Sequence, residues 1–247
     1  MRIAVISDVH SNLRALEAVL ADIGAADAYW HLGDAVGYGP DPDAVVERLR
    51  QLGAISVRGN HDDAVAGGEC IRWFVADAQE AAEWSRARIS AATRAWLAAL
   101  PLQLVQETPV GSFTLVHGSP RDPLLEYVYS RAVAREILPE IKTRHCLVGH
   151  SHIPLHFQTT GERDSSLEEW QVDSGHPARL GEGRAILNPG GVGQPRDGDP
   201  RAAYMIIDTG AGEAAWRRVD YDIEATQRAM RDAGLPPALA FRLSLGH

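Results

Sequence analysis

The 247-residue sequence predicts an α/β protein in which parallel strands deliver polar side chains to one edge of a sheet. Five short apolar runs each end at a residue that can bind a metal: IAVISD at Asp8, WHLGD at Asp34, ISVRGN at Asn60, FTLVH at His117 and CLVGH at His150. Runs of this length fit buried parallel strands, and in open α/β sheets ligands bind beyond the carboxyl ends of such strands. We therefore expect these five side chains to lie together.

The N-terminal part of the chain has the pattern of a βαβαβ unit. A strand at IAVIS precedes a helix that Ser11 or Asn12 caps and Gly24 ends, because the apolar residues between them recur at helical spacing. A strand at DAYWHLGD, a helix at PDPDAVVERLRQLG and a strand at AISVRGNHD follow. A helical segment is then expected at about 64–100, with a helix at 77–100 that either covers the predicted site or packs on the sheet.

The rest of the chain predicts a second sheet. Strands at PLQLVQE and GSFTLVHG, a helical region at about 122–141 and a strand at HCLVGH come first. After His152 the pattern is all-β, with short strands broken by Gly, Pro and Asp, which we interpret as the second sheet. The polar segment at about 160–183 predicts a projecting hairpin or mobile loop, and a terminal helix is expected at about 222–233. We expect residues 1–247 to form one domain.

Composition and charge exclude several classes of function. The net charge of -9 argues against general binding to a nucleic-acid backbone, because neutralising phosphates requires a basic surface. The first residues are too short an apolar run for a signal peptide, and no later run is long enough to span a membrane, so we expect a cytoplasmic protein. Cys70 and Cys146 are expected to be reduced core residues, and Lys142, the only lysine, to be a solvated surface residue.

The candidate metal ligands are carboxylate, amide and imidazole groups without a thiolate. His10 and His152 join the five strand-end residues, and the set divides into two groups joined by one bridging carboxylate. The two groups and the bridge are Asp8, His10 and His152; Asn60, His117 and His150; and Asp34. Such mixed ligands suit Mn, Fe, Zn or Ni better than Ca or Mg alone. Two such ions generate hydroxide at neutral pH and clamp the oxygens of a displacement at phosphorus, so the set predicts phosphoester hydrolysis.

These residues stand in motifs that resemble those of the calcineurin-like metallophosphoesterases, whose pattern is D-x-H, G-D, G-N-H-D/E, a lone H and G-H-x-H. The motifs occur here in that order as Asp8-Val9-His10, Gly33-Asp34, Gly59-Asn60-His61-Asp62, His117-Gly118 and Gly149-His150-Ser151-His152. The resemblance implies a four-layer αββα sandwich with a dinuclear centre and the division of ligands given above. It also implies that His61 meets the phosphate and protonates the leaving oxygen.

Two departures from the family pattern bear on the substrate. The protein-phosphatase and symmetrical diadenosine-tetraphosphatase branches carry G-D-x-V-D-R-G. Here Gly37 replaces the Asp that pairs with the catalytic His, and Tyr38 replaces an Arg that grips the phosphate. The chain is more similar to small bacterial and archaeal phosphoesterases with G-D-x-x-G-x-G-P and an N-P-G-S-V-G loop, here residues 188–193. Some members of that wider branch resemble asymmetrical diadenosine-tetraphosphate hydrolases.

Several residues near the motifs are candidates for substrate contacts. Arg58, Arg121 and Arg196 each lie beside a motif, and one of them could replace the missing Arg; the alternative for each is a salt bridge that fixes a loop. Tyr38 is a further candidate contact.

Other titratable residues have structural alternatives. Asp62 or Asp63 either orients His61 or caps the helical segment that follows. Three further histidines fall within predicted strands and are expected to be core or supporting residues: His31, His145 and His156.

Together these features predict a dinuclear metal-dependent phosphoesterase that acts on a phosphodiester or a nucleotide phosphoanhydride. A metal-bridging hydroxide would attack phosphorus, with Asp34 and His61 as the catalytic residues. The expected ligands are two divalent transition-metal ions and a small phosphorylated substrate such as a nucleotide. Two alternatives remain: a phosphomonoesterase or Ser/Thr protein phosphatase on the same site, and a non-catalytic scaffold with this fold.

Overall fold

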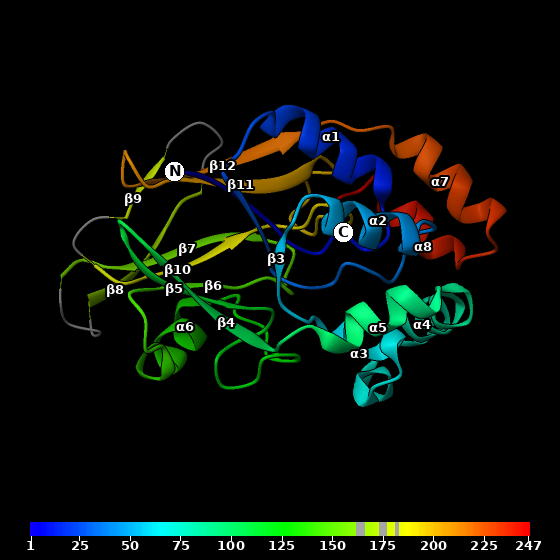
Figure 1. Ribbon diagram of the computed structural model, residues 1–247, viewed down its shortest axis with the longest axis horizontal. Helices are drawn as coiled ribbons and strands as arrows, with labels where there is room; N and C mark the ends of the chain where they lie inside the picture. Colours follow the sequence, from blue (N-terminus) through cyan, green and yellow to red (C-terminus); the bar gives the residue numbers. More distant parts are fainter. Residues whose placement is uncertain (162–165, 173–176, 181–182) are drawn as a thin grey trace.

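The computed structural model describes residues 1–161, 166–172, 177–180 and 183–247. It contains two mixed β-sheets with helices outside them (Figure 1). The first sheet has the order β3 (Ile55–Ser56), β2 (Ala28–His31), β1 (Arg2–Ile6), β11 (Ala202–Asp208), β12 (Glu213–Val219) and β9 (Ala178–Arg179). The second has the order β4 (Gln103–Thr108), β5 (Gly111–Val116), β6 (His145–Leu147), β10 (Ala185–Pro189), β7 (Pro154–Thr159) and β8 (Leu167–Trp170).

The layers follow from the alternation of side chains along buried strands. In β1, Ile3 and Val5 face the second sheet and pack with Phe113 and Leu115 of β5. The intervening residues of β1 face the helices α1 (Leu13–Ile23) and α2 (Pro42–Gln51). The outer face of the second sheet is covered by α6 (Arg131–Ile137). The order of layers is helix, sheet, sheet, helix, and the predicted αββα sandwich is confirmed.

The prediction assigned the wrong strands to the second sheet. We expected it to begin after His152, but it begins with β4, and its neighbours β5 and β6 also precede that residue. Conversely, β11 and β12 return to the first sheet, where β11 pairs antiparallel with β1. Strand pairing depends on contacts between distant segments, so the hydrophobic pattern of each strand predicts its existence but not its partner.

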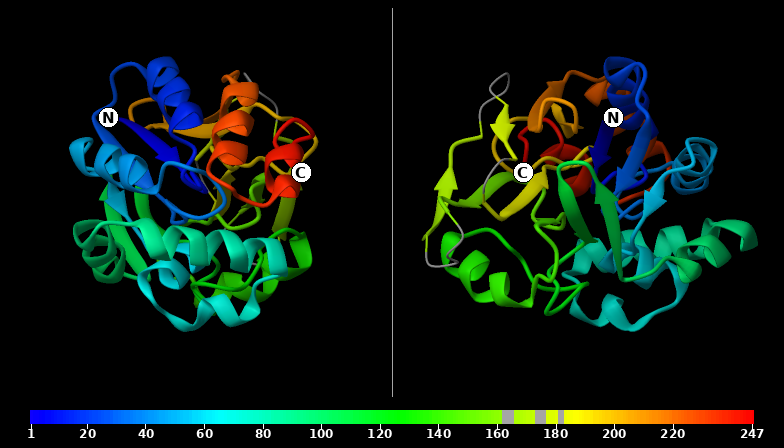
Figure 2. Two further views of the ribbon diagram at one scale, coloured as in Figure 1. Left: turned by 90° about the vertical axis from the view of Figure 1, so that its right-hand side faces the viewer. Right: turned by 60° about the vertical axis from the view of Figure 1, so that its left-hand side comes forward.

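The helical segment at about 64–100 consists of four short elements rather than one long helix. They are α3 (Asn60–Ala66), η1 (Glu69–Trp73), α4 (Ala76–Arg88) and α5 (Ala91–Ala99). The expected helix at 77–100 breaks at Ile89, whose backbone is extended, and Ser90 caps α5 by accepting a hydrogen bond from Thr93 N–H at 3.1 Å. The C-terminal helices α7 (Ile223–Asp232) and α8 (Pro237–Arg242) pack against α4, where Trp84 Nε1 donates to the Ala233 carbonyl at 2.9 Å. The left view of Figure 2 shows α7 and α8, in orange and red, above α4 and α5.

One other local prediction needs correction, and the prediction for the segment at 160–183 is tested only in part. The helical region expected at 122–141 is helical only in α6 and in η2 (Leu138–Glu140), because Asp122 Oδ1 accepts the backbone N–H groups of Leu124 and Leu125 and forms a turn. The segment at 160–183 contributes strands β8 and β9 to the two sheets. The predicted mobility of that segment also concerns residues 162–165, 173–176 and 181–182, which lie outside the described residues.

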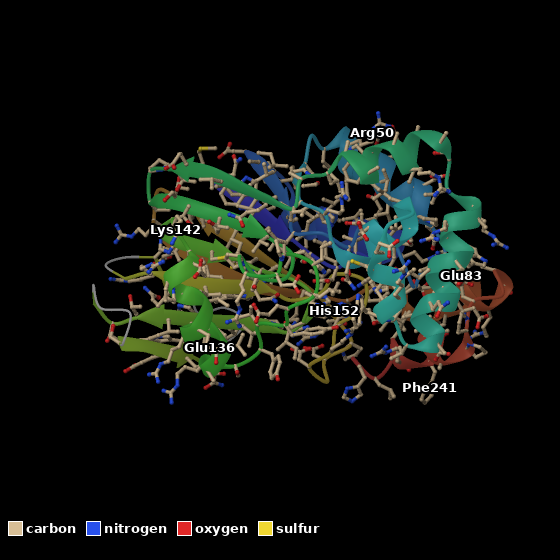
Figure 3. All side chains as sticks on the ribbon, turned by 90° about the horizontal axis from the view of Figure 1, so that it is seen from below. Arg50, Glu83, Glu136, Lys142, His152 and Phe241 are labelled. Carbon is tan, nitrogen blue, oxygen red and sulfur yellow. The ribbon has the colours of Figure 1, made fainter. Side chains whose placement is uncertain are left out.

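Several predictions about single residues are confirmed. Asn12, one of the two predicted caps, caps α1 by accepting a hydrogen bond from Ala15 N–H at 3.1 Å, and the terminal helix expected at about 222–233 is α7. Cys70 and Cys146 are both free and buried. Lys142 is exposed at the margin of the molecule, whereas His152 lies near its middle (Figure 3). Within the described part of the chain, no helix is both long and apolar enough to cross a membrane.

Candidate metal centre and substrate pocket

The predicted ligands converge where strand ends of both sheets meet. Asp8 and Asp34 follow β1 and β2 of the first sheet, and Asn60 begins α3 just after β3. His117 and His150 follow β5 and β6, which belong to the second sheet, so the site lies between two sheets rather than along one. All the predicted ligands are buried, and Asn60, at 6% exposure, is the most exposed of them. Burial of so many polar groups requires a compensating partner.

The first group has two imidazoles whose free nitrogens face each other. His10 Nδ1 donates to the Val36 carbonyl at 3.1 Å, and His152 Nδ1 donates to the Gln194 carbonyl. Since Nδ1 carries the proton in each ring, both Nε2 atoms present lone pairs, and they lie 3.1 Å apart. Asp8 Oδ1 lies 3.3 Å from His152 Nε2. Lone pairs and a carboxylate pointing at one small volume are the arrangement that a cation stabilises.

The second group has the same character. His117 Nδ1 donates to the Leu32 carbonyl at 2.8 Å, which directs Nε2 toward the other three members. That Nε2 lies 3.0 Å from Asn60 Oδ1, 3.2 Å from His150 Nδ1 and 3.3 Å from Asp34 Oδ2. Although burial opposes a charge on this ring, the nearby Asp34 carboxylate raises the pKa of His117 to about 9. A proton on His117 thus offsets part of the negative charge of the buried carboxylate.

Unpartnered atoms show that these residues fit divalent cations. Both carboxylate oxygens of Asp8, Oδ2 of Asp34 and Nε2 of His150 are buried without a hydrogen-bond partner among the described residues. Burial raises the pKa of Asp8 to about 7 and holds the pKa of His150 well below its usual range. Neutral imidazoles and orphaned carboxylate oxygens are the donor set that transition ions bind. Asp34 Oδ2 lies 3.6 Å from His10 Nε2 of the first group and 3.3 Å from His117 Nε2 of the second, so it adjoins both groups.

The backbone at the candidate ligands is unusual. A positive φ, which disfavours any residue with a Cβ, occurs at five of the predicted ligands and turns their side chains inward. These residues are Asp8 (54°), His10 (48°), Asp34 (56°), His150 (63°) and His152 (59°). Tertiary contacts hold these turns: Gly193 N–H donates to the Asp8 carbonyl at 2.9 Å, and Asn188 Nδ2 donates to the Gly149 carbonyl at 2.7 Å.

His61 lies at the inner end of the pocket between two aromatic rings. Its ring centroid is 4.4 Å from that of Tyr38 and 4.3 Å from that of Phe74, and its backbone N–H donates to Asp34 Oδ1 at 2.8 Å. Burial lowers the pKa of His61 to about 4, so the free side chain is neutral near pH 7. Its Nδ1 atom has no described hydrogen-bond partner, and a Cβ at Gly37 would lie only 2.4 Å from it. No carboxylate takes the place of the Asp that the family pattern puts at position 37.

Asp62 has the capping role among its predicted alternatives. Its carboxylate accepts backbone N–H groups from Gly59 at 3.0 Å, Asp34 at 2.9 Å and Val36 at 3.2 Å. The first contact caps α3, and the other two join that helix to the loop that carries Asp34. Asp62 therefore fixes the relative positions of Asp34 and His61 through the backbone and does not touch the His61 ring.

Of the predicted arginines, only Arg196 lines the pocket. Arg58 Nη1 lies 3.5 Å from Asp63 Oδ1, and Arg121 forms ion pairs with Glu126 and Glu136. These contacts are the loop-fixing salt bridges given above as the alternative, and neither arginine lines the pocket. Arg196 donates to the Tyr38 hydroxyl at 3.3 Å and to Gln194 Oε1 at 2.9 Å.

The pocket has a volume of about 450 Å³ and extends from the metal centre to the surface. Its inner end includes Asp34, Asn60, His61, His150 and His152. Sequence reasoning missed seven lining residues: Trp73, Phe74, Val75, Ala78, Leu125, Tyr127 and Arg242. None of them belongs to a motif, and the sequence signal among them is the adjacent aromatic pair Trp73-Phe74.

The three histidines predicted to fall within strands are buried, as expected of core residues. His31 and His145 are fully buried, and His156 is 5% exposed. His145 packs against Phe113, with ring centroids 4.8 Å apart, and burial lowers its pKa to about 4.

Comparison with known proteins identifies the family. The profile of the calcineurin-like phosphoesterase superfamily domain matches residues 1–212, so the chain belongs to that superfamily. Membership implies a metal-dependent phosphoric ester hydrolase, in agreement with the motifs and with the His and Asp cluster.

Three similar proteins extend over the whole chain. An uncharacterized protein of Methanocaldococcus jannaschii, MJ0912, is 36% identical, and the match covers 99% of this chain and 98% of that one. A metallophosphoesterase from Sphaerobacter thermophilus is 43% identical, with a TM-score of 0.88 over 100% of this chain and 99% of that one. A hypothetical protein from Pyrococcus horikoshii OT3, PH1004, is 20% identical and shares the fold, with a TM-score of 0.80 over 100% of this chain and 98% of that one.

Proposed function

We propose that the protein is a dinuclear metallophosphoesterase that hydrolyses a phosphodiester or a nucleotide phosphoanhydride. The observation that carries this proposal is the arrangement of the two imidazole and carboxylate groups around Asp34. Asp34 belongs to one cluster with His117 and His150 and to another with His10 and His61, while Asp8 forms a third cluster with His10 and His152. A single ion could not contact all these atoms, and two ions that share the Asp34 carboxylate could.

Bound divalent ions would supply Lewis acidity and lower the pKa of a coordinated water. The chain's own residues supply the remaining functions. Asp34 holds the backbone of His61 through its Oδ1 atom, and the rings of Tyr38 and Phe74 hold the imidazole. From this position His61 would donate a proton to the oxygen of the leaving group, and the substrate's negative charge would favour the protonated form.

A phosphomonoesterase on the same site is the second candidate, and Arg196 is the observation that favours it. A terminal phosphomonoester carries about two negative charges near pH 7, because its second pKa is about 6. A fixed guanidinium therefore stabilises its binding. Arg196 lines the pocket beside Tyr38, although its nearest described partners are neutral oxygens. A diester has one charge and leaves room for the aromatic ring that this chain has at position 38.

Metal reconstitution tests the first part of the proposal. Protein stripped with a chelator should lose phosphoesterase activity and regain it with Mn²⁺. Mg²⁺ should restore less of the activity, because it binds imidazole ligands less well than Mn²⁺ does. Elemental analysis after saturation with Mn²⁺ should give two ions per chain. Fewer than one ion per chain would contradict a dinuclear centre.

A substrate panel tests the second part. The Mn²⁺-loaded protein should have a higher kcat/KM for bis(p-nitrophenyl) phosphate or a dinucleoside polyphosphate than for p-nitrophenyl phosphate or a phosphopeptide. A preference for the monoester of about tenfold, or ~1.4 kcal/mol of transition-state stabilisation, would instead support the phosphomonoesterase. Arg196→Gln would then be expected to reduce the monoester activity more than the diester activity.

A further inference from the structure

The outer part of the pocket presents aromatic side chains that the metal centre does not use. Trp73 and Tyr127 line it and are 74% and 42% exposed. The Tyr127 ring stacks on His150, with centroids 3.8 Å apart and planes 16° apart, so one face of the tyrosine is fixed beside a predicted ligand. Large exposed aromatic side chains at the mouth of a pocket mark a binding surface, and their flat faces match planar ligands.

Two arginines give the same region a positive charge. Arg196 and Arg242 both line the pocket, and among the described residues neither forms an ion pair with an Asp or Glu side chain; Arg242 Nε donates to the backbone oxygen of His247. Burial and the charge of Arg196 lower the pKa of Arg242, so the two guanidinium groups repel each other in the free protein. In a chain with a net charge of -9, two half-buried arginines that form no ion pair with a described Asp or Glu side chain indicate an anionic ligand.

Arg242 also lies where the pocket meets a second recess. That recess has a volume of about 250 Å³ and shares Tyr38, Val75, Ala78 and Arg242 with the main pocket. The available space therefore continues past Arg242, away from the metal centre. A substrate with a single small phosphate would leave this space and both exposed aromatic rings without contacts.

We propose that the outer pocket binds a nucleotide-type substrate, with its planar base against Trp73 and Tyr127 and a second anionic group beyond the reacting phosphate on Arg242. This inference rests on the proposed function, because it assigns the substrate class of the same site. The net charge of -9 on each copy opposes self-association through the exposed aromatic residues, whereas the two arginines attract an anionic small molecule.

A pair of substrates with the same leaving group tests the base contact. The p-nitrophenyl ester of thymidine 5′-phosphate carries a base, and methyl p-nitrophenyl phosphate does not. We expect the ratio of their kcat/KM values to favour the thymidine ester and to fall about tenfold or more in Trp73→Ala, as stacking contacts of this kind do. Trp170→Ala is the matched control, because Trp170 is 48% exposed on β8 at the far edge of the second sheet. It should keep the wild-type ratio.

Calorimetric titration of the metal-free protein with AMP and ADP tests the contact with Arg242. ADP should bind about tenfold more tightly than AMP, as for an added charge-assisted contact, and Arg242→Gln should remove most of this difference. Arg228→Gln is the matched control, since Arg228 is exposed on α7 and lies 3.5 Å from Glu224. It should preserve the preference for ADP.

These measurements separate failure of the inference from failure of the proposed function. Equal kcat/KM values for both esters, together with equal affinities for AMP and ADP, would overturn the inference while leaving phosphoesterase activity in place. Binding of ADP that depends on Trp73 and Arg242, without hydrolysis of either ester, would support the inference and contradict the proposed function. Sedimentation in which Trp73→Ala dissociates an oligomer, with an unchanged ester ratio, would assign the aromatic residues to a subunit interface and overturn the inference.

Discussion

Gly37 tests whether the position of His61 determines the rate. Gly37 has a φ of 98°, and a Cβ there would lie 2.4 Å from His61 Nδ1, 3.0 Å from Cγ and 3.2 Å from Cβ of the same residue. Ordinary van der Waals contact begins at 3.4 Å, so Gly37→Ala must move the imidazole by about 1 Å. The rings of Tyr38 and Phe74 restrict that movement on both sides.

The size of the effect follows from two separate costs. A residue with a Cβ in a left-handed conformation loses about 1–2 kcal/mol of stability, whatever its surroundings. Displacement of a catalytic group by about 1 Å lowers the rate by about 100-fold. Gly53→Ala isolates the first cost, because Gly53 has a φ of 62° and no atom within 4 Å of the added Cβ. Gly37→Ala should therefore be destabilised at least as much as Gly53→Ala, because the clash adds to the conformational cost, and only Gly37→Ala should lose activity.

The assay compares diesters with good and poor leaving groups in the Mn²⁺-loaded variants. If His61 donates a proton, the loss in Gly37→Ala should be larger for the poor leaving group, which depends on protonation. Metal content, measured in parallel, should stay at the wild-type value. Near wild-type turnover of the poor leaving group by a folded Gly37→Ala protein would refute the role of His61. The same contact implies that an aspartate cannot be introduced at position 37 without displacing His61.

Further substitutions test the other parts of the site and the core. His61→Ala should lower the rate by about 10²–10⁴ while both metals stay bound, whereas Asp34→Ala should lower the metal content itself; the reverse result by elemental analysis would exchange their roles. Asp62→Asn presents an NH₂ group to a backbone N–H, and thermal unfolding should show that the free energy of unfolding falls by roughly 1–3 kcal/mol. An unchanged Tm would contradict the role of the Asp62 carboxylate in joining α3 to the loop that carries Asp34. The lowered pKa of His145, about 4 against 6.5, means that the unfolded chain takes up the proton first as pH falls below 6.5, so stability is lost toward pH 4. His145→Asn should reduce the loss of unfolding free energy between about pH 7 and 5.5 by about 1 kcal/mol; parallel pH profiles for the two proteins would contradict this.

The sequence predicted the metal centre better than the pocket that surrounds it. Each candidate ligand lies within five residues after a strand, so its approximate position follows from local pattern: Asp8 lies two residues beyond β1, and His117 one residue beyond β5. The cap Asn12 was predictable for the same reason, since an N-cap bonds to a residue three positions away. The prediction of one helix at 77–100 was wrong, because the segment forms two helices, α4 and α5. One extended residue between them lowers stability little, since both helices still pack on the core.

Contacts between distant segments could not be predicted from the sequence. The three arginines near the motifs were equivalent in sequence, and only the fold turned Arg196 into the pocket while it placed Arg58 beside Asp63 and Arg121 beside Glu126. Arg242 follows the last predicted element, yet it lines the same pocket as residues near the N-terminus.

The sequence by itself determined which residues could bind metal and that strand ends would present them. It also determined the absence of a carboxylate at position 37. Only the tertiary structure decided that the ligands come from two sheets, that β11 lies beside β1, and that aromatic side chains and two arginines surround the site. The physical reason is the range of the interactions. Hydrophobic periodicity and capping act over a few residues, whereas strand pairing and pocket walls depend on which surfaces the whole chain buries together.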